Sequence, residues 1–520
     1  MDPHRYKYYR LAFMGALAIL VAPLFQIRYV PLVDFPSHLV RCFILYRYHD
    51  VTVFQRTYQV LYEPIPNVAC DIVITSLLHV FSVLTAGRLF IGLIICLYAL
   101  GCHLLAAELQ GRPSWVAIPC AFTVYSSPLM WGLVNYVLGL ALFMICLAIW
   151  MRWRASWSAV RYLLVTALVF SAFLTHLTAY GFLGITFVIM TGYDLVTHRR
   201  TLTQSAGDLG VLVLPLIAFA VFMTKSGSVG SIQWSTVTGK IGELFPFFRT
   251  YSLAFDPFFL GTVALCILVL WWCSSRVQPV WPATTTAGVF TALFLACPRV
   301  LFTSSGADAR FVPPAILLFV LSLRVEVPKR VGAAILFIVL MASILRVNVV
   351  RREWMQFDNT IAQAVGLTDT IPTAAKIYPA LFPMECRPDQ GAWLNKAFSR
   401  LHGGRVLAAL QDDECRKQDV VFEHVLEYAT IRTSAFVPSL HAHRGQQPLV
   451  FRIIPRYRAA TTSLEPDWMN DAREYDLIWS YSMPEESSRE LCGIATRIAE
   501  VGEFALWKVN SPLPSKDANF

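Results

Sequence analysis

The chain has 520 residues, of which 56% are hydrophobic and only 15% are charged, and its formal net charge at pH 7 is +9. Soluble globular proteins carry about 25% charged residues, so this composition argues against a soluble enzyme and is typical of a multi-pass membrane protein. The modest positive charge lies mostly in short loops between apolar segments, a pattern that reflects membrane topology rather than nucleic-acid binding.

The N-terminus begins with a short basic stretch, HRYKYYR, and continues into an apolar run long enough to cross a bilayer. Secretory signal peptides share this pattern, but no small-x-small cleavage site follows the run before residue 31. We therefore predict an uncleaved first span at about residues 10–30.

The first span is followed by the motif PLVDFPSHLVR at residues 31–41. Pro36 permits a tight turn or a helix start, and residues 37–48 have the i, i+3, i+4 apolar spacing of a helix that lies along the membrane interface. On such a helix His38 and Arg41 are neighbours. Asp34 either caps this helix or forms a small polar patch with the imidazole and the guanidinium.

Apolar segments of span length recur as far as residue 348, and we expect about 11 to 13 spans. The segments before Arg152 are odd in number, at about 10–30, 68–86, 88–108, 115–128 and 133–151. An N-terminus and an Arg152 on the same side of the membrane require an even number of crossings. One segment is therefore re-entrant or split, and Pro119 and Pro128 make the fourth a candidate.

The positive-inside tendency places the basic loops in the cytoplasm. They contain Arg5, Lys7, Arg10, Arg152, Arg154, Arg161, His198, Arg199, Arg200, Arg276, Arg324, Lys329 and Arg330. The turns between them are then extracytoplasmic, and they include residues 225–257, residues 297–314 and the turn at His176. A last span at about 331–347 would deliver the C-terminal part to the same side.

The composition of the sequence changes after Arg351, where charged residues and short β-rich runs replace the long apolar segments. We predict a transmembrane module at residues 1–350, with its first outer loop at 31–67, and a small soluble extracytoplasmic α/β domain at 351–520. The predicted strands lie in AAKIYPALF, SAFVPSLHA, QPLVFRII, YDLIWSYS and GEFALWKVN, with helices near 353–366 and 417–430. A disulfide between Cys386 and Cys415 remains open. The domain would dock the acceptor or cover a cavity.

Polar residues gather at the predicted outer ends of the spans. Arginine binds phosphate in a bidentate fork, and an aspartate can accept a proton from a hydroxyl nucleophile, so the set suggests group transfer from a lipid phosphate. Taken singly, each residue also has a structural explanation, as a helix cap, a satisfied turn residue, a snorkelling arginine or a salt-bridge partner. Their placement on one side of the membrane favours the functional interpretation.

Several motifs spread over the chain resemble the GT-C glycosyltransferases, which are polytopic enzymes that use polyprenyl-phosphate-linked sugars. They are PLVDFPSHLVR, WGLVNYVLGLAL, THLTAYGFL, GADARFVPP, HVLEYATIRTSAFVPSL and YDLIWSY. Within this superfamily the chain is similar to a bacterial group related to protein mannosyltransferases and lipid A aminoarabinose transferases. The resemblance implies a GT-C-like helical module in the bacterial inner membrane, with Asp34 as the catalytic base.

The first outer loop departs from the pattern of many relatives, which carry an Asp-Glu pair or an Asp-x-Asp in this region. Here Phe35 follows Asp34. This difference favours a metal-independent mechanism, although it leaves a divalent cation open as a cofactor.

The resulting hypothesis is a membrane glycosyltransferase that moves a sugar, with inversion, from a polyprenyl-phosphate donor to a lipid, glycan or protein acceptor on the extracytoplasmic face. Membrane lipids are further partners, and nucleic acid is not. The predicted site consists of catalytic Asp34 and His38, the donor phosphate-binding Arg41, Arg299 and Arg310, and the cavity-lining Asn135, His176 and Asp308.

Other classes of protein remain as alternatives. A transporter or flippase of lipid-linked sugars would place ionisable residues near the bilayer midplane and often shows internal repeats, and neither is apparent. A non-catalytic subunit of a polysaccharide assembly complex would give the DFPSH motif no role. An O-antigen polymerase or ligase would carry an outer loop rich in Arg and His, whereas residues 225–257 contain one Arg and no His.

Overall fold

The computed structural model describes residues 3–62, 66–225, 231–237, 240, 244, 250, 255–302, 304–371, 377–381, 428, 451–455, 469, 472–473, 475–481, 483, 485–502 and 504–510. The chain divides into two compact units. The first contains Met1–Phe35, Leu61–Met355 and Gln447–Phe451, and the second contains Pro36–Val60, Gln356–Gln446 and Arg452–Phe520.

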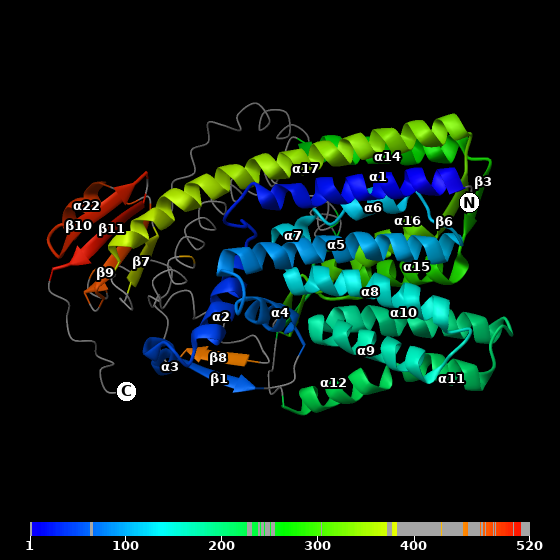
Figure 1. Ribbon diagram of the computed structural model, residues 1–520, viewed down its shortest axis with the longest axis horizontal. Coiled ribbons are helices and arrows are strands. Elements are labelled where there is room, and N and C mark those ends of the chain that lie inside the picture. The colour runs from blue at the N-terminus through cyan, green and yellow to red at the C-terminus, as the bar shows by residue number, and fades with distance from the viewer. Residues whose placement is uncertain are drawn as a thin grey trace. The chain divides into compact units, whose positions relative to one another are not determined.

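The first unit is a bundle of helices (Figure 1). Its elements are α1 (Pro3–Val21), η1 (Ala22–Phe25), α4 (Ala69–Leu77), α5 (Val83–Gln110), α6 (Ala117–Phe122), α7 (Ser127–Met130), α8 (Val134–Trp153), α9 (Ala159–Thr175), α10 (Leu177–Val196), α11 (Leu202–Gly210), α12 (Val213–Lys225), α14 (Phe255–Cys273), α15 (Trp281–Ala296), η2 (Ala309–Phe311), α16 (Val312–Ser322) and the first part of α17 (Lys329–Gly366).

The helices α5 and α8 form the centre of this bundle. A Cβ placed on Gly101 of α5 would lie 3.0 Å from the carbonyl oxygen of Ala141 on α8, so the missing side chain lets the two backbones approach closely. At the far end of α8 the indole of Trp150 stacks on the ring of Phe187 at 4.2 Å. Small residues at helix contacts let helices in apolar surroundings pack closely.

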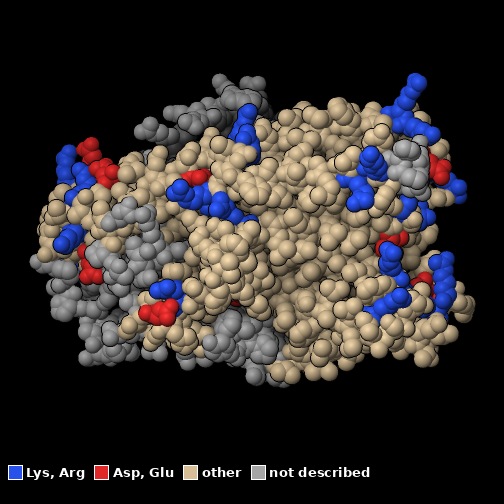
Figure 2. All heavy atoms as spheres, in the orientation of Figure 1, with Lys and Arg blue, Asp and Glu red and all other residues tan. Residues whose placement is uncertain are grey.

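Six helices within the described ranges are long and apolar enough to cross a membrane, and the bent pair α11–α12 makes up to seven. Two shorter apolar helices, Ala159–Thr175 and Ala309–Ser322, fall below that length. The expected number of about 11 to 13 was too high for the described residues, because hydropathy alone counts such shorter helices, α4 and the α6–α7 pair as spans. Figure 2 shows a wide surface over the helices without Lys, Arg, Asp or Glu, so the protein is a multi-pass membrane protein.

The predicted basic loops meet at one end of the bundle. Arg152 at the end of α8 lies 3.4 Å from the carboxylate of Glu108 near the end of α5. The side chain of Gln110 donates to the carbonyl of Leu321 at the end of α16 over 2.7 Å. At this end β3 (Arg276–Pro279) pairs antiparallel with β6 (Leu323–Glu326), near the N-terminus in Figure 1. At the other end, the turn at His176 meets the turn before α16 through Tyr136, which contacts His176 and Arg310.

The number of apolar segments before Arg152 is odd because one of them, α4, does not run from one end of the bundle to the other. This helix has 9 residues, about 14 Å, and is too short to cross a bilayer. Its first turn bonds to α8 through Asn135, and α5 then starts at the same end, where Arg88 donates to the carbonyl of Ile27 over 3.2 Å. The second segment therefore does not cross.

The fourth segment is split into α6 and α7, as the prolines predicted, but it still joins the two ends of the bundle. Trp115 before α6 packs against Tyr9 near the start of α1 with ring centroids 5.5 Å apart. Trp131 after α7 accepts a hydrogen bond from Asp34 at the opposite end. Four segments, α1, α5, the α6–α7 pair and α8, therefore run between the two ends of the bundle before Arg152, and this number is even.

The described residues of the second unit form short helices and small sheets. The helices α2 (Phe35–Arg47) and α3 (Thr52–Thr57) enclose a small core of Val40, Ile44 and Phe54. Strand β1 (Tyr58–Tyr62) pairs with β8 (Phe451–Pro455). The larger sheet has the order β10-β11-β9-β7, formed by β7 (Ile377–Leu381), β9 (Leu477–Tyr481), β10 (Ala495–Val501) and β11 (Phe504–Val509), with α22 (Glu485–Leu491) between β9 and β10.

The predicted C-terminal elements are largely present. β7, β8, β9 and β11 lie in four of the predicted strand segments, and the helix predicted at 353–366 is the continuation of α17. β7 runs parallel to β9, whereas β11 is antiparallel to both β9 and β10. SAFVPSLHA, the pair Cys386 and Cys415, and residues 417–430 apart from Tyr428 lie outside the described residues.

Candidate functional site

Asp34 is held by its backbone against the turn between α7 and α8. The amides of Val33 and Asp34 donate to the carbonyls of Met130 and Trp131 over 3.0 and 3.1 Å. Gly132 has φ +76°, and a Cβ there would lie 2.5 Å from the Asp34 nitrogen, so only glycine fits this contact. The Asp34 residue itself is exposed. The result is an accessible carboxylate on a fixed backbone.

Tyr136, in the first turn of α8, joins the ends of several helices. Its hydroxyl donates to the carbonyl of Arg310 in η2 over 2.8 Å. Its ring meets the ring of His176 in an edge-to-face contact with centroids 5.5 Å apart. Tyr136 therefore places Arg310 and His176 beside one another, although they lie far apart in the sequence.

His176 ends α9 and begins α10, and its side chain caps the second helix. The backbone amide of Thr178 donates to its Nδ1 over 3.2 Å, which leaves the ring proton on Nε2. Burial and the nearby Arg310 guanidinium lower the pKa of His176 well below its ordinary value, so the imidazole is neutral. A Cβ on Gly139 would lie 3.1 Å from the His176 Cβ, so glycine there lets α10 approach α8.

Asn135 uses its side-chain amide to hold neighbouring backbone. Its Oδ1 accepts from the amide of Cys70 and its Nδ2 donates to the carbonyl of Asn67, both over 2.9 Å. Asn67 has a left-handed backbone with φ 73°. These bonds fix the segment that leads into α4 against the first turn of α8, and Asn135 is itself buried.

Asp308 was predicted to line the substrate cavity, with a salt bridge to Arg310 as the structural alternative, and its carboxylate pairs with Lys240. The Lys240 ammonium also donates to the carbonyls of Phe294 and Cys297 over 3.0 and 2.6 Å, so Lys240 is bound to the end of α15. The other carboxylate oxygen of Asp308 accepts from the amide of Ala309 over 2.9 Å and caps η2. The pair thereby fixes the residue directly before Arg310.

Arg299 and Arg310 stand on either side of a small sheet of β2 (Ser231–Gln233), β4 (Val300–Phe302) and β5 (Ser304–Ser305). The carbonyl of Arg299 accepts from the amide of Ala307 over 2.9 Å, which closes this turn. Arg299 is exposed, whereas Arg310 is half-buried. Of the two predicted phosphate ligands, Arg310 is the one beside His176.

His38 and Arg41 lie on α2, in the second unit, where the sequence predicted a helix. Nη2 of Arg41 lies 2.8 Å from Nδ1 of His38, which is the neighbour relation expected at i, i+3. Both side chains are half-buried. Together they form a preformed polar pair one turn after the start of the helix.

Lys240 was not among the site residues predicted from the sequence. Its partner Asp308 is 68 positions away, and local spacing carries no information about such a contact. The only signal in the sequence was a lysine in the interior of residues 225–257, a stretch with few charged residues. Within the described ranges, no group of three or more His, Cys, Asp or Glu side chains is placed to hold a metal ion.

No protein-family model matches the chain, and no curated protein matches it. Among solved structures, the chain is similar to the crystal structure of ArnT from Cupriavidus metallidurans bound to undecaprenyl phosphate. The sequence identity is 12%, the match covers 98% of this chain and 99% of that chain, and the TM-score is 0.49. The class that the helices and strands define is an α-helical multi-pass membrane protein with a small C-terminal sheet region.

Proposed function

We propose that this protein is a membrane glycosyltransferase that transfers a sugar from a polyprenyl-phosphate donor to a hydroxyl acceptor. The observation that carries the proposal is the geometry around the start of α8. The turn before this helix holds the exposed Asp34, and its first turn holds Arg310 and His176 through Tyr136. An acid and a cation are thus anchored on the same short segment, at the end of the bundle opposite the basic loops.

The reaction forms one carbon–oxygen bond, breaks another and moves one proton. The acceptor oxygen attacks the anomeric carbon, its proton passes to the Asp34 carboxylate, and the bond between the anomeric carbon and the phosphate oxygen breaks. Polyprenyl phosphate leaves with the electron pair of that bond, and the configuration at the sugar is inverted. General-base assistance of this kind is worth about 10²- to 10⁴-fold in rate.

Arg310 is proposed to stabilise the negative charge that develops on the departing phosphate. Its backbone is fixed by Tyr136 on one side and by the Asp308 cap on the other, so little reorganisation is needed when the charge appears. Because the neighbouring His176 is neutral, it offers an Nε2 proton without adding a second positive charge. Asp308 acts through this positioning rather than on the substrate.

The remaining predicted residues take supporting roles. Asn135 holds the wall of the site through the backbone bonds of its amide. His38 and Arg41 follow Asp34 directly on α2, and we propose that they bind the sugar or the donor phosphate as a pair. The exposed Arg299 is proposed as an outer contact for the phosphate. No step in this mechanism is routed through a metal ion.

The test is Asp34→Asn in the full-length protein. A deletion strain complemented with wild type should restore one class of surface glycan, and mass spectrometry of its lipid extract should show the polyprenyl-linked donor consumed. Asp34→Asn should leave that donor accumulated, with transfer reduced by about 10²-fold or more. Expression and membrane insertion should not change, because the side chain is exposed.

Asp50→Asn is the matched control, since Asp50 is an exposed acid just beyond α2 that pairs with Arg47 at 3.6 Å. It should restore the glycan like wild type. Full transfer by Asp34→Asn would remove Asp34 from the chemistry and with it the proposed function.

A further inference from the structure

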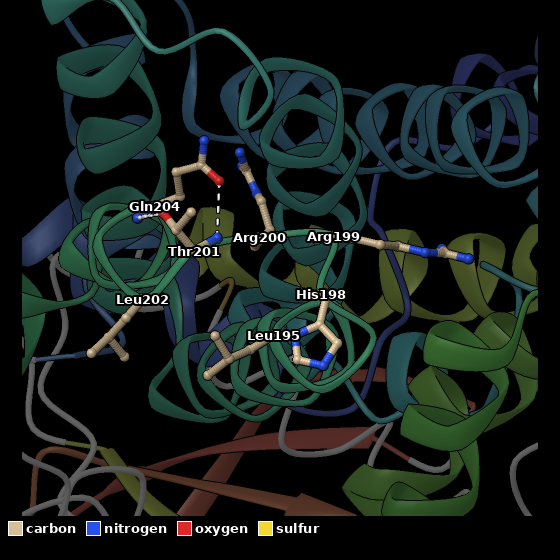
Figure 3. A pocket seen from close by; sticks show the side chains of 7 residues that line it. All are labelled: Leu195, His198, Arg199, Arg200, Thr201, Leu202 and Gln204. Atoms are coloured by element: carbon tan, nitrogen blue, oxygen red, sulfur yellow. Dashed lines mark hydrogen bonds between the residues drawn. The ribbon is translucent and has the colours of Figure 1, made fainter.

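A cavity of about 540 Å³ lies in the connection between α10 and α11, at the basic end of the helical unit. Figure 3 shows the side chains that line it. Its lining consists of Leu195, His198, Arg199, Arg200, Thr201, Leu202 and Gln204. Cavities that hold small ligands or headgroups have volumes of about 300–1,000 Å³. The cavity is remote from Asp34 and His176, which lie at the other end of the bundle.

Hydrogen bonds hold the backbone of the connection that lines this cavity. The amide of Thr201 donates to Oε1 of Gln204 over 3.1 Å, and the amide of Gln204 donates to Oγ1 of Thr201 over 3.3 Å (Figure 3). On the other side, the amides of Arg199 and Arg200 both donate to the carbonyl of Asp194, over 2.8 and 3.2 Å. The connection is therefore a rigid turn rather than a loose loop.

Charges around the cavity are unevenly balanced. Arg154 and Arg200 share the carboxylates of Asp194 and Asp208 at 2.7 to 3.1 Å, so these two cations are neutralised by two anions. Arg199 has no carboxylate partner in the described part of the chain, and its guanidinium lies 5.6 Å from the ring of Tyr193. One full positive charge is therefore left over at the rim.

The cavity also has an apolar border. Leu202 is 74% exposed and Val196, one residue beyond Leu195, is 78% exposed. In Figure 3 the side chains of Arg200 and Gln204 extend to one side, while those of Arg199 and His198 extend away from them. A cavity lined by the cation of Arg199 on one side and by the exposed Leu202 on the other suits a ligand that is anionic at one end and apolar at the other.

We propose that this cavity binds the headgroup of an anionic phospholipid in the leaflet at the basic end of the bundle. The phosphodiester would accept hydrogen bonds from Arg199, with His198 beside it, and the first carbons of the acyl chains would cover Leu202 and Val196. The site does not depend on the proposed glycosyl transfer, and it provides a lipid anchor between α10 and α11.

The test is retention of phosphatidylglycerol by the purified full-length protein, measured by native mass spectrometry across a titration, with phosphatidylcholine as the neutral reference. Arg199→Gln should weaken phosphatidylglycerol binding about fivefold, because one arginine near an anionic surface contributes about that factor. Arg199→Lys should retain most of the binding. Both variants should keep the thermal stability of wild type without added lipid, because the side chain is exposed.

Arg152→Gln is the matched control, because it removes one charge at the same end, from a side chain that is 71% exposed and pairs with Glu108. It should leave phosphatidylglycerol binding within about twofold of wild type. An equal loss in both glutamine variants, or an unchanged affinity in Arg199→Gln, would overturn the site. Displacement of the lipid by millimolar inorganic phosphate would assign the cavity to a soluble anion instead and overturn the lipid proposal.

Discussion

The buried pair of Lys240 and Asp308 offers the sharpest test of the site's architecture. Asp308 is fully buried and the Lys240 side chain is 7% exposed, so solvent screening is minimal. Removing one partner of a buried ion pair leaves the other charge without compensation, which typically costs about 3–5 kcal/mol. We expect Lys240→Met to lower the free energy of unfolding by about that amount.

The size of the effect follows from the number of contacts that are lost. Lys240 also satisfies the carbonyls of Phe294 and Cys297, so its replacement leaves these acceptors in need of new partners. Asp308→Asn should cost less than Lys240→Met, because a neutral amide can still accept from the Ala309 amide and cap η2. The double variant should recover about 1–3 kcal/mol relative to the sum of the single changes.

The assay is denaturant unfolding of the full-length protein in detergent micelles, with a double-mutant cycle over Lys240 and Asp308. Arg489→Met is the control, since Arg489 and Glu485 form a pair that is mostly exposed and worth about 0–1 kcal/mol. If Lys240→Met lowers the free energy of unfolding by less than about 1 kcal/mol and the double variant is strictly additive, Lys240 and Asp308 do not form a stabilising buried ion pair.

Gly132→Ala should destabilise the protein by about 1–3 kcal/mol, because its left-handed φ is strained for alanine and the new Cβ would collide with the Asp34 nitrogen. Sugar transfer by Gly132→Ala should fall by more than the loss of folded protein explains. Normal transfer by this variant would show that the position of Asp34 is not critical. His176 should make stability depend on pH. Its pKa is lowered in the folded state, so the unfolded chain binds more protons below about pH 6.5 and stability falls as the pH drops. The free energy of unfolding should fall by up to about 1.4 kcal/mol per pH unit. In His176→Gln the unfolding temperature should depend less on pH between pH 7.5 and 5.5 than it does in wild type. An unchanged slope in the variant would mean that His176 is not the group that titrates.

Local sequence patterns predicted the parts of the fold that local forces determine. The apolar segments became helices, the basic loops gathered at one end, and α2 began directly after Asp34 with His38 and Arg41 as neighbours. Strands such as β9 were also evident, because runs like YDLIWSY are rich in residues that favour strands. β10 (Ala495–Val501) was missed, because its exposed residues give ATRIAEV little apolar alternation.

Long-range contacts limited what the sequence could predict. Hydropathy could not distinguish α4, which stays at one end, from a true span, because the difference lies in where α5 starts. It could not identify Lys240 as the partner of Asp308 either, since that choice depends on how α15 and the outer loop pack. The sequence shows which charged residues need a partner if they are buried. Which partner each one has depends on how the helices pack.

The segment WGLVNYVLG explains why the proposed acid and cation would act as a unit. Trp131 holds the Asp34 backbone, Asn135 holds the start of α4, and Tyr136 holds Arg310 and His176. These contacts are made by the turn between α7 and α8 and by the first turn of α8. The helix α8 is largely buried, so its backbone is rigid. A change in this segment should therefore shift both groups together, so its variants should be non-additive with Asp34→Asn rather than independent of it.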